Sequence, residues 1–188
     1  MAEISVNSNL RLKKTVVLVG MMGAGKTAVG KALASLLHVP FRDSDAEIES
    51  AANMSIAEIF ERDGEPFFRQ KEGQIIERLL EGPPCILSTG GGAFLKPENR
   101  AAISNKGVAV CLNADIELLW SRVRHKDSRP LLRTENPKQT LAALFEARVP
   151  IYQMADLQVT TNPRNSIEDT ARSVIEALKT REDVLEDN

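Results

Sequence analysis

Short apolar runs alternate with longer amphipathic stretches along most of the chain. The runs that favour buried strands are 15–19 (TVVLV), 39–42 (VPFR), 84–88 (PCILS), 108–112 (VAVCL) and 157–160 (LQVT). The stretches between them have helical spacing; in residues 28–37, for example, Val29, Leu33 and Leu36 fall on one side. Strands that alternate with helices predict a parallel sheet covered on both faces, so we expect an α/β fold.

Two of the expected helices carry a start signal of their own. Ser55 is followed three residues later by Glu58, and Ser166 is followed in the same way by Asp169. In such a capping box, the serine and the acidic side chain each accept a hydrogen bond from a backbone N–H at the helix start. We therefore expect helices to begin directly after Ser55 and Ser166.

The first apolar run leads into GMMGAGKT, residues 20–27, which has the form G-x-x-x-x-G-K-T. Glycines at these places let backbone N–H groups close around phosphate oxygens. Lys26 would reach the β- and γ-phosphates of a nucleotide, and the Thr27 hydroxyl would hold a magnesium ion. The helix that follows adds the partial positive charge of its N-terminus. The motif in this context predicts nucleotide binding.

Composition narrows the class of protein. The chain has 188 residues, enough for one domain with a sizeable core, and a formal net charge of −2. Without a basic field we expect no nucleic-acid partner. No apolar segment resembles a signal peptide or a membrane span, so we expect a cytoplasmic protein with no membrane partner.

Cys85 and Cys111 lie in apolar runs and are expected to be reduced core residues. Core or lining packing is also expected for Trp120 and Tyr152, each the single residue of its type.

The two ends of the chain lack a clear pattern. We expect a flexible arm at residues 1–13, a single domain at 14–180 and an acidic, frayed tail at 181–188. Within the domain, HKDSRPLLRTENP at 125–137 has no clear period. A loop of this length is usually functional or mobile, although an ordinary solvated basic loop is the alternative.

Two aspartates follow the second apolar run, in the sequence RDSD. Asp43 and Asp45 would point to the same side of an extended segment, at a strand end where parallel sheets place their ligands. Near a phosphate loop they suggest a magnesium ligand and a base; the alternative is a turn whose aspartates cap a helix. Many phosphate-loop NTPases carry the metal carboxylate at the end of a later strand. Ser88 and Thr89 stand there instead, so Asp43 is the candidate.

Two further motifs carry polar or glycine-rich patterns. Arg69 and Glu72 are three apart on an expected helix and could pair, either within a site or as an ordinary surface pair. The sequence STGGGA, residues 88–93, follows the third run, and its glycines would let backbone approach a ligand closely. A flexible turn is the alternative.

Taken together, these motifs resemble those of the shikimate kinases. GMMGAGKT, RDSDAEIE, FFRQKE, TGGGA, the RPLL that begins at Arg129 and the ARVPIY around Arg148 occur in the order and approximate spacing of that family, across residues 15–179. The resemblance implies a three-layer fold with a five-stranded parallel sheet in the order 2-3-1-4-5, helices on both faces and a mobile lid at about 125–137. It also implies transfer of the γ-phosphoryl group of ATP, with Mg²⁺, to the 3-hydroxyl of shikimate. This step belongs to chorismate and aromatic amino-acid biosynthesis.

The resemblance also implies roles for single residues. Thr27 and Asp43 would hold the metal, and Asp45, Lys26 and Arg129 would be catalytic. Glu72 would orient Arg69 within the shikimate site. The residues implied to bind ATP are Gly23, Ala24, Gly25, Lys26, Thr27, Ala28, Arg122, Arg129 and Arg164, and those implied to bind shikimate are Asp45, Arg69, Glu72, Gly90, Gly91, Gly92 and Arg148.

Other classes of protein remain as alternatives. Another small-metabolite kinase of the same fold, such as gluconate kinase, would share the phosphate loop. We would not expect such a kinase to combine RDSD and TGGGA with Arg69 and Arg148. A regulatory nucleotide-binding module or GTPase switch commonly carries N-K-x-D, and here Val108 stands where the aspartate is needed in NKGV. We expect small-molecule substrates only and a monomer.

Overall fold

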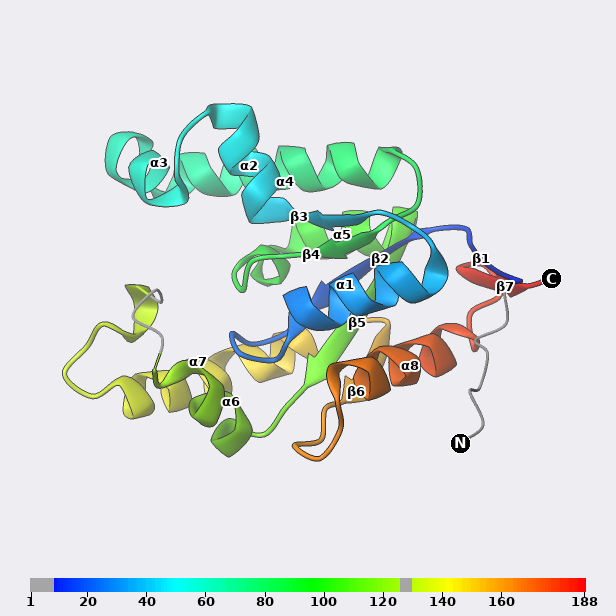
Figure 1. Ribbon diagram of the computed structural model, residues 1–188. Coiled ribbons are helices and arrows are strands. Elements are labelled where there is room, and N and C mark those ends of the chain that lie inside the picture. Colours follow the sequence, from blue (N-terminus) through cyan, green and yellow to red (C-terminus); the bar gives the residue numbers. More distant parts are fainter. Residues whose placement is uncertain (1–8, 126–129) are drawn as a thin grey trace.

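The computed structural model describes residues 9–125 and 130–188. Its main sheet has five parallel strands in the order β3–β4–β2–β5–β6, which confirms the expected order (Figure 1). The strands are β2 (Thr15–Val19), β3 (Phe41–Asp43), β4 (Ile86–Ser88), β5 (Gly107–Asn113) and β6 (Leu157–Thr160). The central strand β2 is buried along its whole length, as its unbroken apolar sequence predicts.

Helices cover both faces of this sheet. The chain leaves β2 in one direction, through α1 (Lys26–Leu37) to β3, and leaves β4 in the other, through α5 (Pro97–Lys106) to β5. Right-handed crossovers in opposite directions place α1 and α5 on opposite faces. Helix α8 (Ile167–Leu178) packs beside α1, and α6 (Ile116–Val123) packs against α7 (Pro137–Tyr152) (Figure 1).

Three helices between β3 and β4 form a smaller unit at the edge of the sheet (Figure 1). They are α2 (Ser44–Ala52), α3 (Ile56–Asp63) and α4 (Glu65–Glu81), and they have a second apolar cluster of Ile48, Ile59, Phe68 and Ile75. The capping boxes at the starts of α3 and α8 are both present, which confirms the predicted helix starts. Cys85 and Cys111 are buried and unpaired, and burial raises the pKa of the Cys111 thiol to about 11.

The aspartates of RDSD do not lie in one extended segment. Strand β3 ends at Asp43, whose side chain accepts a hydrogen bond from the backbone N–H of Ala46, and Asp45 lies in the first turn of α2. Our same-side argument from strand geometry was therefore wrong in its premise, because a helix begins one residue after Asp43. The helix-capping alternative is correct for Asp43.

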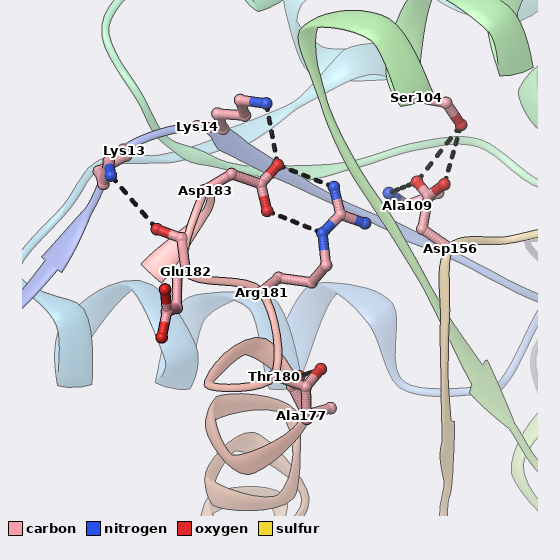
Figure 2. Close-up of polar contacts among 10 residues, drawn as sticks. All are labelled: Lys13, Lys14, Ser104, Ala109, Asp156, Ala177, Thr180, Arg181, Glu182 and Asp183. Atoms are coloured by element: carbon pink, nitrogen blue, oxygen red, sulfur yellow. Dashed lines mark hydrogen bonds and ion pairs between the residues drawn. The ribbon is translucent and has the colours of Figure 1, made fainter. Parts of the chain in front are cut away.

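The ends of the chain pair with each other, where we expected a loose arm and a frayed tail. Strand β1 (Leu10–Leu12) runs antiparallel to β7 (Leu185–Asp187). We call this two-stranded unit the terminal ribbon. Figure 2 shows the polar contacts beside it, in which the Asp183 carboxylate accepts from Lys14 Nζ at 3.0 Å and from Arg181 Nε at 2.8 Å. No local pattern signals this pairing, because the two strands are three residues each and come from opposite ends of the sequence.

Within the described part of the chain, no helix combines the length and the apolarity that crossing a membrane requires.

Candidate active site

A cavity of about 700 Å³ opens at the carboxyl ends of the sheet strands. The phosphate loop, both aspartates of RDSD and the start of the glycine-rich loop all contribute to its walls. Its lining consists of Met22, Gly23, Ala24, Gly25, Lys26, Thr27, Ala28, Val29, Asp43, Asp45, Ser88, Thr89, Gly90, Gly91, Arg122, Thr161, Asn165, Ser166, Ile167 and Thr170.

The phosphate loop has the backbone shape that its glycines predict. Gly23 and Gly25 have φ values of 82° and 96°, a region that other residues rarely adopt. The Lys26 ammonium donates to the carbonyls of Gly20 and Met21, at 2.8 and 2.9 Å. Arg122 reaches the loop from α6 and donates to the Gly23 carbonyl at 2.9 Å. Lys26 within the loop and Arg122 beside it thus bring two positive charges to this part of the cavity.

Both carboxylates line the cavity, Asp43 from the end of β3 and Asp45 from the first turn of α2. Burial is the main cause that raises the pKa of Asp45, and the charges of Asp43 and Glu49 raise it further, against the opposing charges of Arg69 and Lys26. A raised pKa makes Asp45 a better proton acceptor than an exposed aspartate. Asp43 uses its Oδ1 to cap α2. This bond leaves its other oxygen available to a ligand.

The three glycines after β4 each face one charged side chain. A Cβ atom on Gly90 would lie 3.1 Å from Asp45 Oδ1, and one on Gly91 would lie 3.3 Å from Arg148 Nη1. A Cβ atom on Gly92 would overlap the guanidinium of Arg69. The glycines are therefore needed for space: they bring one carboxylate and two guanidinium groups to the same stretch of backbone. The close approach seen at STGGGA is to side chains of this chain, and an approach of this backbone to a ligand stays a prediction.

Arg69 is held by acidic side chains on its own helix. Its Nη1 donates to Glu72 Oε1 at 2.9 Å, and its Nε lies 3.4 Å from Glu65 Oε1. Glu72 is only 1% exposed, and burial raises its pKa although Arg69 opposes this shift. The pair is thus no ordinary surface pair, because the glutamate is buried beneath the arginine and fixes its direction.

One part of the cavity wall consists of residues for which we predicted no role in the site. Thr161, Asn165, Ser166 and Ile167 line it, although sequence reasoning assigned a role there to Arg164. Arg164 is exposed on the loop after β6, and it is not among the residues that line the cavity. Of these four residues, only Ser166 belongs to a motif that the sequence showed, its capping box.

The expected lid lies partly outside the residues that the structure describes. Arg129, which we expected to be catalytic and to bind ATP, is outside the described residues. Of the expected lid at 125–137, residues 125 and 130–137 are described, with a short 3₁₀ turn at Pro130–Leu132 before α7 begins. Arg148, near the end of α7, is half-buried beside Gly91.

A parallel α/β sheet that holds a phosphate loop beside a wall of opposite charges is the arrangement of a small phosphate-loop kinase. Comparison with known proteins gives the particular family. Residues 22–179 match the family model described as shikimate kinase, and the chain belongs to the shikimate kinase family.

Individual relatives agree with this assignment. The chain is 68% identical over 175 residues to a shikimate kinase of Ruegeria pomeroyi, across 93% of this chain and 90% of the relative. The structure of a shikimate kinase from Acinetobacter baumannii in complex with shikimate superposes with a TM-score of 0.83 at 38% identity, over 89% of this chain and 93% of that one. A gluconokinase from Sinorhizobium meliloti superposes with a TM-score of 0.60 at 18% identity, over 90% of this chain and 94% of that one, which shows a shared fold alone.

Proposed function

We propose that this protein transfers the γ-phosphoryl group of ATP to the 3-hydroxyl of shikimate, giving shikimate 3-phosphate and ADP. The observation that carries this proposal is the wall in which Gly90, Gly91 and Gly92 face Asp45, Arg148 and Arg69, next to a phosphate loop. Two guanidinium groups suit a carboxylate, and a carboxylate suits a hydroxyl group. Shikimate offers one carboxylate and three hydroxyls on a small ring.

The residues divide between the two substrates. Residues 23–28 surround the ATP phosphates, with the backbone N–H groups of the loop and the Lys26 ammonium as donors. Arg122 lines the cavity and donates to the Gly23 carbonyl, and it would flank the base of ATP, as the family resemblance implies. Arg69 and Arg148 bind the shikimate carboxylate. Glu72 fixes the orientation of Arg69, as its buried ion pair indicates.

Asp45 accepts a hydrogen bond from the reacting hydroxyl and aligns its oxygen with the γ-phosphorus. The new oxygen–phosphorus bond forms as the bond from that phosphorus to the bridging oxygen of ADP breaks, and the hydroxyl proton passes to Asp45. Lys26 carries part of the negative charge on the transferring group. Arg129 of the proposed lid, outside the described residues, would add a second cation there.

The residues present fit a magnesium ion. Mg²⁺ takes one or two carboxylates, a hydroxyl, waters and substrate phosphates rather than a cage made only of protein groups. Thr27 and Asp43 both line the cavity, and one oxygen of Asp43 is left beyond its capping bond. When bound, the ion neutralises phosphate charge.

We also propose that residues 14–180 form one kinase domain and that the protein is a monomer in the cytoplasm with no nucleic-acid or membrane partner.

A coupled assay of ADP release tests the function. The protein is offered ATP and Mg²⁺ with shikimate, with gluconate, or with no acceptor. We expect turnover with shikimate far above the other two reactions. Equal or greater turnover with gluconate would overturn the proposed acceptor, and equal ADP release without any acceptor would favour a nucleotide-hydrolysing module instead.

A further inference from the structure

We call Gly90, Gly91 and Gly92, together with the three charged side chains that they face, the acceptor wall. The hydroxyl of Tyr152 joins two parts of this wall. It donates a hydrogen bond to the Gly91 carbonyl at 2.5 Å. The guanidinium of Arg148, one turn earlier on α7, lies close enough to the phenol for its positive charge to oppose the rise in the pKa of Tyr152. A Cβ atom on Gly91 would lie 3.3 Å from Arg148 Nη1 and 3.8 Å from Tyr152 Oη. The three groups therefore converge, although the sequence offered only a packing role for this tyrosine.

Other side chains hold the segment that follows the glycines. Asn99 donates to the Ala93 carbonyl at 2.9 Å, and Arg100 donates to the carbonyls of Phe94 and Leu95 at 2.8 and 3.0 Å. Among the side-chain hydrogen bonds of the described residues, that of Tyr152 is the one that reaches the carbonyl of a glycine in the wall. Its ring is buried and stacks on Phe94, with ring centroids 6.5 Å apart. The ring is thus fixed by packing, and its hydroxyl has a fixed direction.

We propose that Tyr152 is a positioning residue for the acceptor acid: its hydroxyl locks the Gly91 backbone and the Arg148 guanidinium into the one arrangement that receives the shikimate carboxylate. This inference rests on the proposed function, in which Arg148 binds that carboxylate. A hydroxyl has one proton to donate and lone pairs to accept with. Donation to Gly91 therefore leaves the oxygen free to accept from Arg148, and one atom sets both distances.

The protonation state of the phenol suits this role. Burial is the main cause that raises the pKa of Tyr152 above its ordinary value of 10.0, and the charge of Arg148 opposes the shift only in part. The hydroxyl therefore keeps its proton at neutral and mildly alkaline pH, and its donation to the Gly91 carbonyl persists over that range.

The first experiment replaces Tyr152 with phenylalanine, which removes the hydroxyl and keeps the ring. We expect KM for shikimate to rise about five- to tenfold, as for the loss of one neutral hydrogen bond. We expect kcat and KM for ATP to stay within about twofold, because the carboxylate is held equally in the ground and transition states. Arg100→Ala is the matched control: it removes an anchor from the same segment but no contact with Arg148. It should lower Tm without a selective rise in KM for shikimate.

A double-mutant cycle tests whether the tyrosine acts through Arg148. In an Arg148→Ala background, Tyr152→Phe should change KM for shikimate by less than about twofold, because the group that it positions is gone. A full five- to tenfold effect in that background would overturn the proposal. So would an equal rise in KM for both substrates, or wild-type constants in Tyr152→Phe.

The single tyrosine permits a test that does not require the variant to fold. Growth on 3-fluorotyrosine labels this one position. We expect its fluorine resonance to move on addition of shikimate, to move far less on addition of ADP, and to lose the response to saturating shikimate in Arg148→Ala. A resonance that ignores shikimate in a labelled enzyme that turns shikimate over would overturn the positioning role alone. Absence of shikimate turnover in the unaltered protein would instead overturn the proposed function.

Discussion

Three adjacent glycines set how closely backbone and charge approach each other in the acceptor wall. A methyl group at Gly92 would overlap the Arg69 guanidinium, which is the far end of a flexible side chain and can move away. Gly92→Ala should therefore weaken shikimate binding by displacing Arg69, and it should lower Tm no more than Arg69→Ala does, because the buried Glu72 then loses the same partner. Gly82 offers a matched control, because its φ of −79° suits alanine and its Cβ atom would be in ordinary contact at 3.5 Å.

We expect Gly92→Ala to raise KM for shikimate about tenfold or more, as for a weakened charge-assisted hydrogen bond of about 1.5–3 kcal/mol. Gly82→Ala should leave every kinetic constant unchanged. Steady-state kinetics and thermal unfolding of the two variants check this. A large drop in Tm for Gly92→Ala with an unaltered KM would mean that the glycine serves the fold.

The two arginines should differ in what else they support. Arg69→Ala and Arg148→Ala should each weaken shikimate binding by about 1.5–3 kcal/mol and leave ATP affinity unchanged. Arg69→Ala should also lower Tm, because it leaves the buried Glu72 carboxylate without its partner. The double variant Arg69→Ala/Glu72→Gln should regain Tm and not shikimate binding. Calorimetric titration and thermal unfolding measure the two effects; equal losses for both substrates would contradict the assignment.

The aspartates of RDSD can be separated by magnesium. Asp43→Asn should raise the magnesium concentration needed for activity, and excess magnesium should restore part of it. Asp45→Asn should lower kcat and weaken shikimate binding, without rescue, because an amide cannot take the proton. Activity measured against magnesium concentration separates the two variants. Rescue of Asp45→Asn alone would mean that their roles are exchanged.

At the scale of elements, short sequence patterns predicted those helices and strands whose formation depends on neighbouring residues. The apolar run at 15–19 matches β2, and the capping boxes mark the starts of α3 and α8. The start of α2 was missed because Asp43 both ends a strand and caps a helix. The expected strand at 39–42 begins two residues before the observed β3 and ends one residue before it does. Side chains that reach the site from a distance were harder to predict. Tyr152 meets Gly91 only because α7 folds back onto the loop after β4.

The part of the cavity wall that Thr161, Asn165 and Ser166 form shows the same limit of prediction from sequence. The family resemblance alone implied that Arg164 binds ATP. The backbone N–H of Arg164 donates to Asn162 Oδ1 in a tight turn, and its neighbours Asn165 and Ser166 line the cavity. Which residue of a turn faces a ligand depends on backbone angles that composition does not specify.

At the scale of the whole molecule, the terminal ribbon closes the fold on the side away from the phosphate loop (Figure 1). It leads directly into the start of β2, whereas the cavity lies beyond the end of that strand. Val184 and Leu185 are buried in the main core, and Leu12 lies beside them in the same cluster. The ribbon thus adds apolar contacts as well as the polar contacts around Asp183 (Figure 2).

These two kinds of contact should differ in how they respond to substitution and to pH. Leu185→Ala should lower the free energy of unfolding by about 2–5 kcal/mol, as for other buried leucines. Asp183→Asn should have a smaller effect, because Asp183 is nearly half exposed. Hydrogen bonds from Arg181 and then Lys14 hold the pKa of Asp183 well below its ordinary value of 3.8. A carboxyl whose folded pKa is lowered stabilises the fold above its unfolded pKa and loses that effect as the pH falls. The difference in the free energy of unfolding between wild type and Asp183→Asn should therefore be largest at pH 7 and shrink as the pH falls below 3.8.

Urea unfolding at several pH values measures this difference. Both variants should keep the wild-type kcat and both KM values, because neither residue lies near the cavity. A change in KM for either substrate, or an Asp183→Asn effect larger than that of Leu185→Ala, would show that the ribbon does more than hold the ends of the chain together.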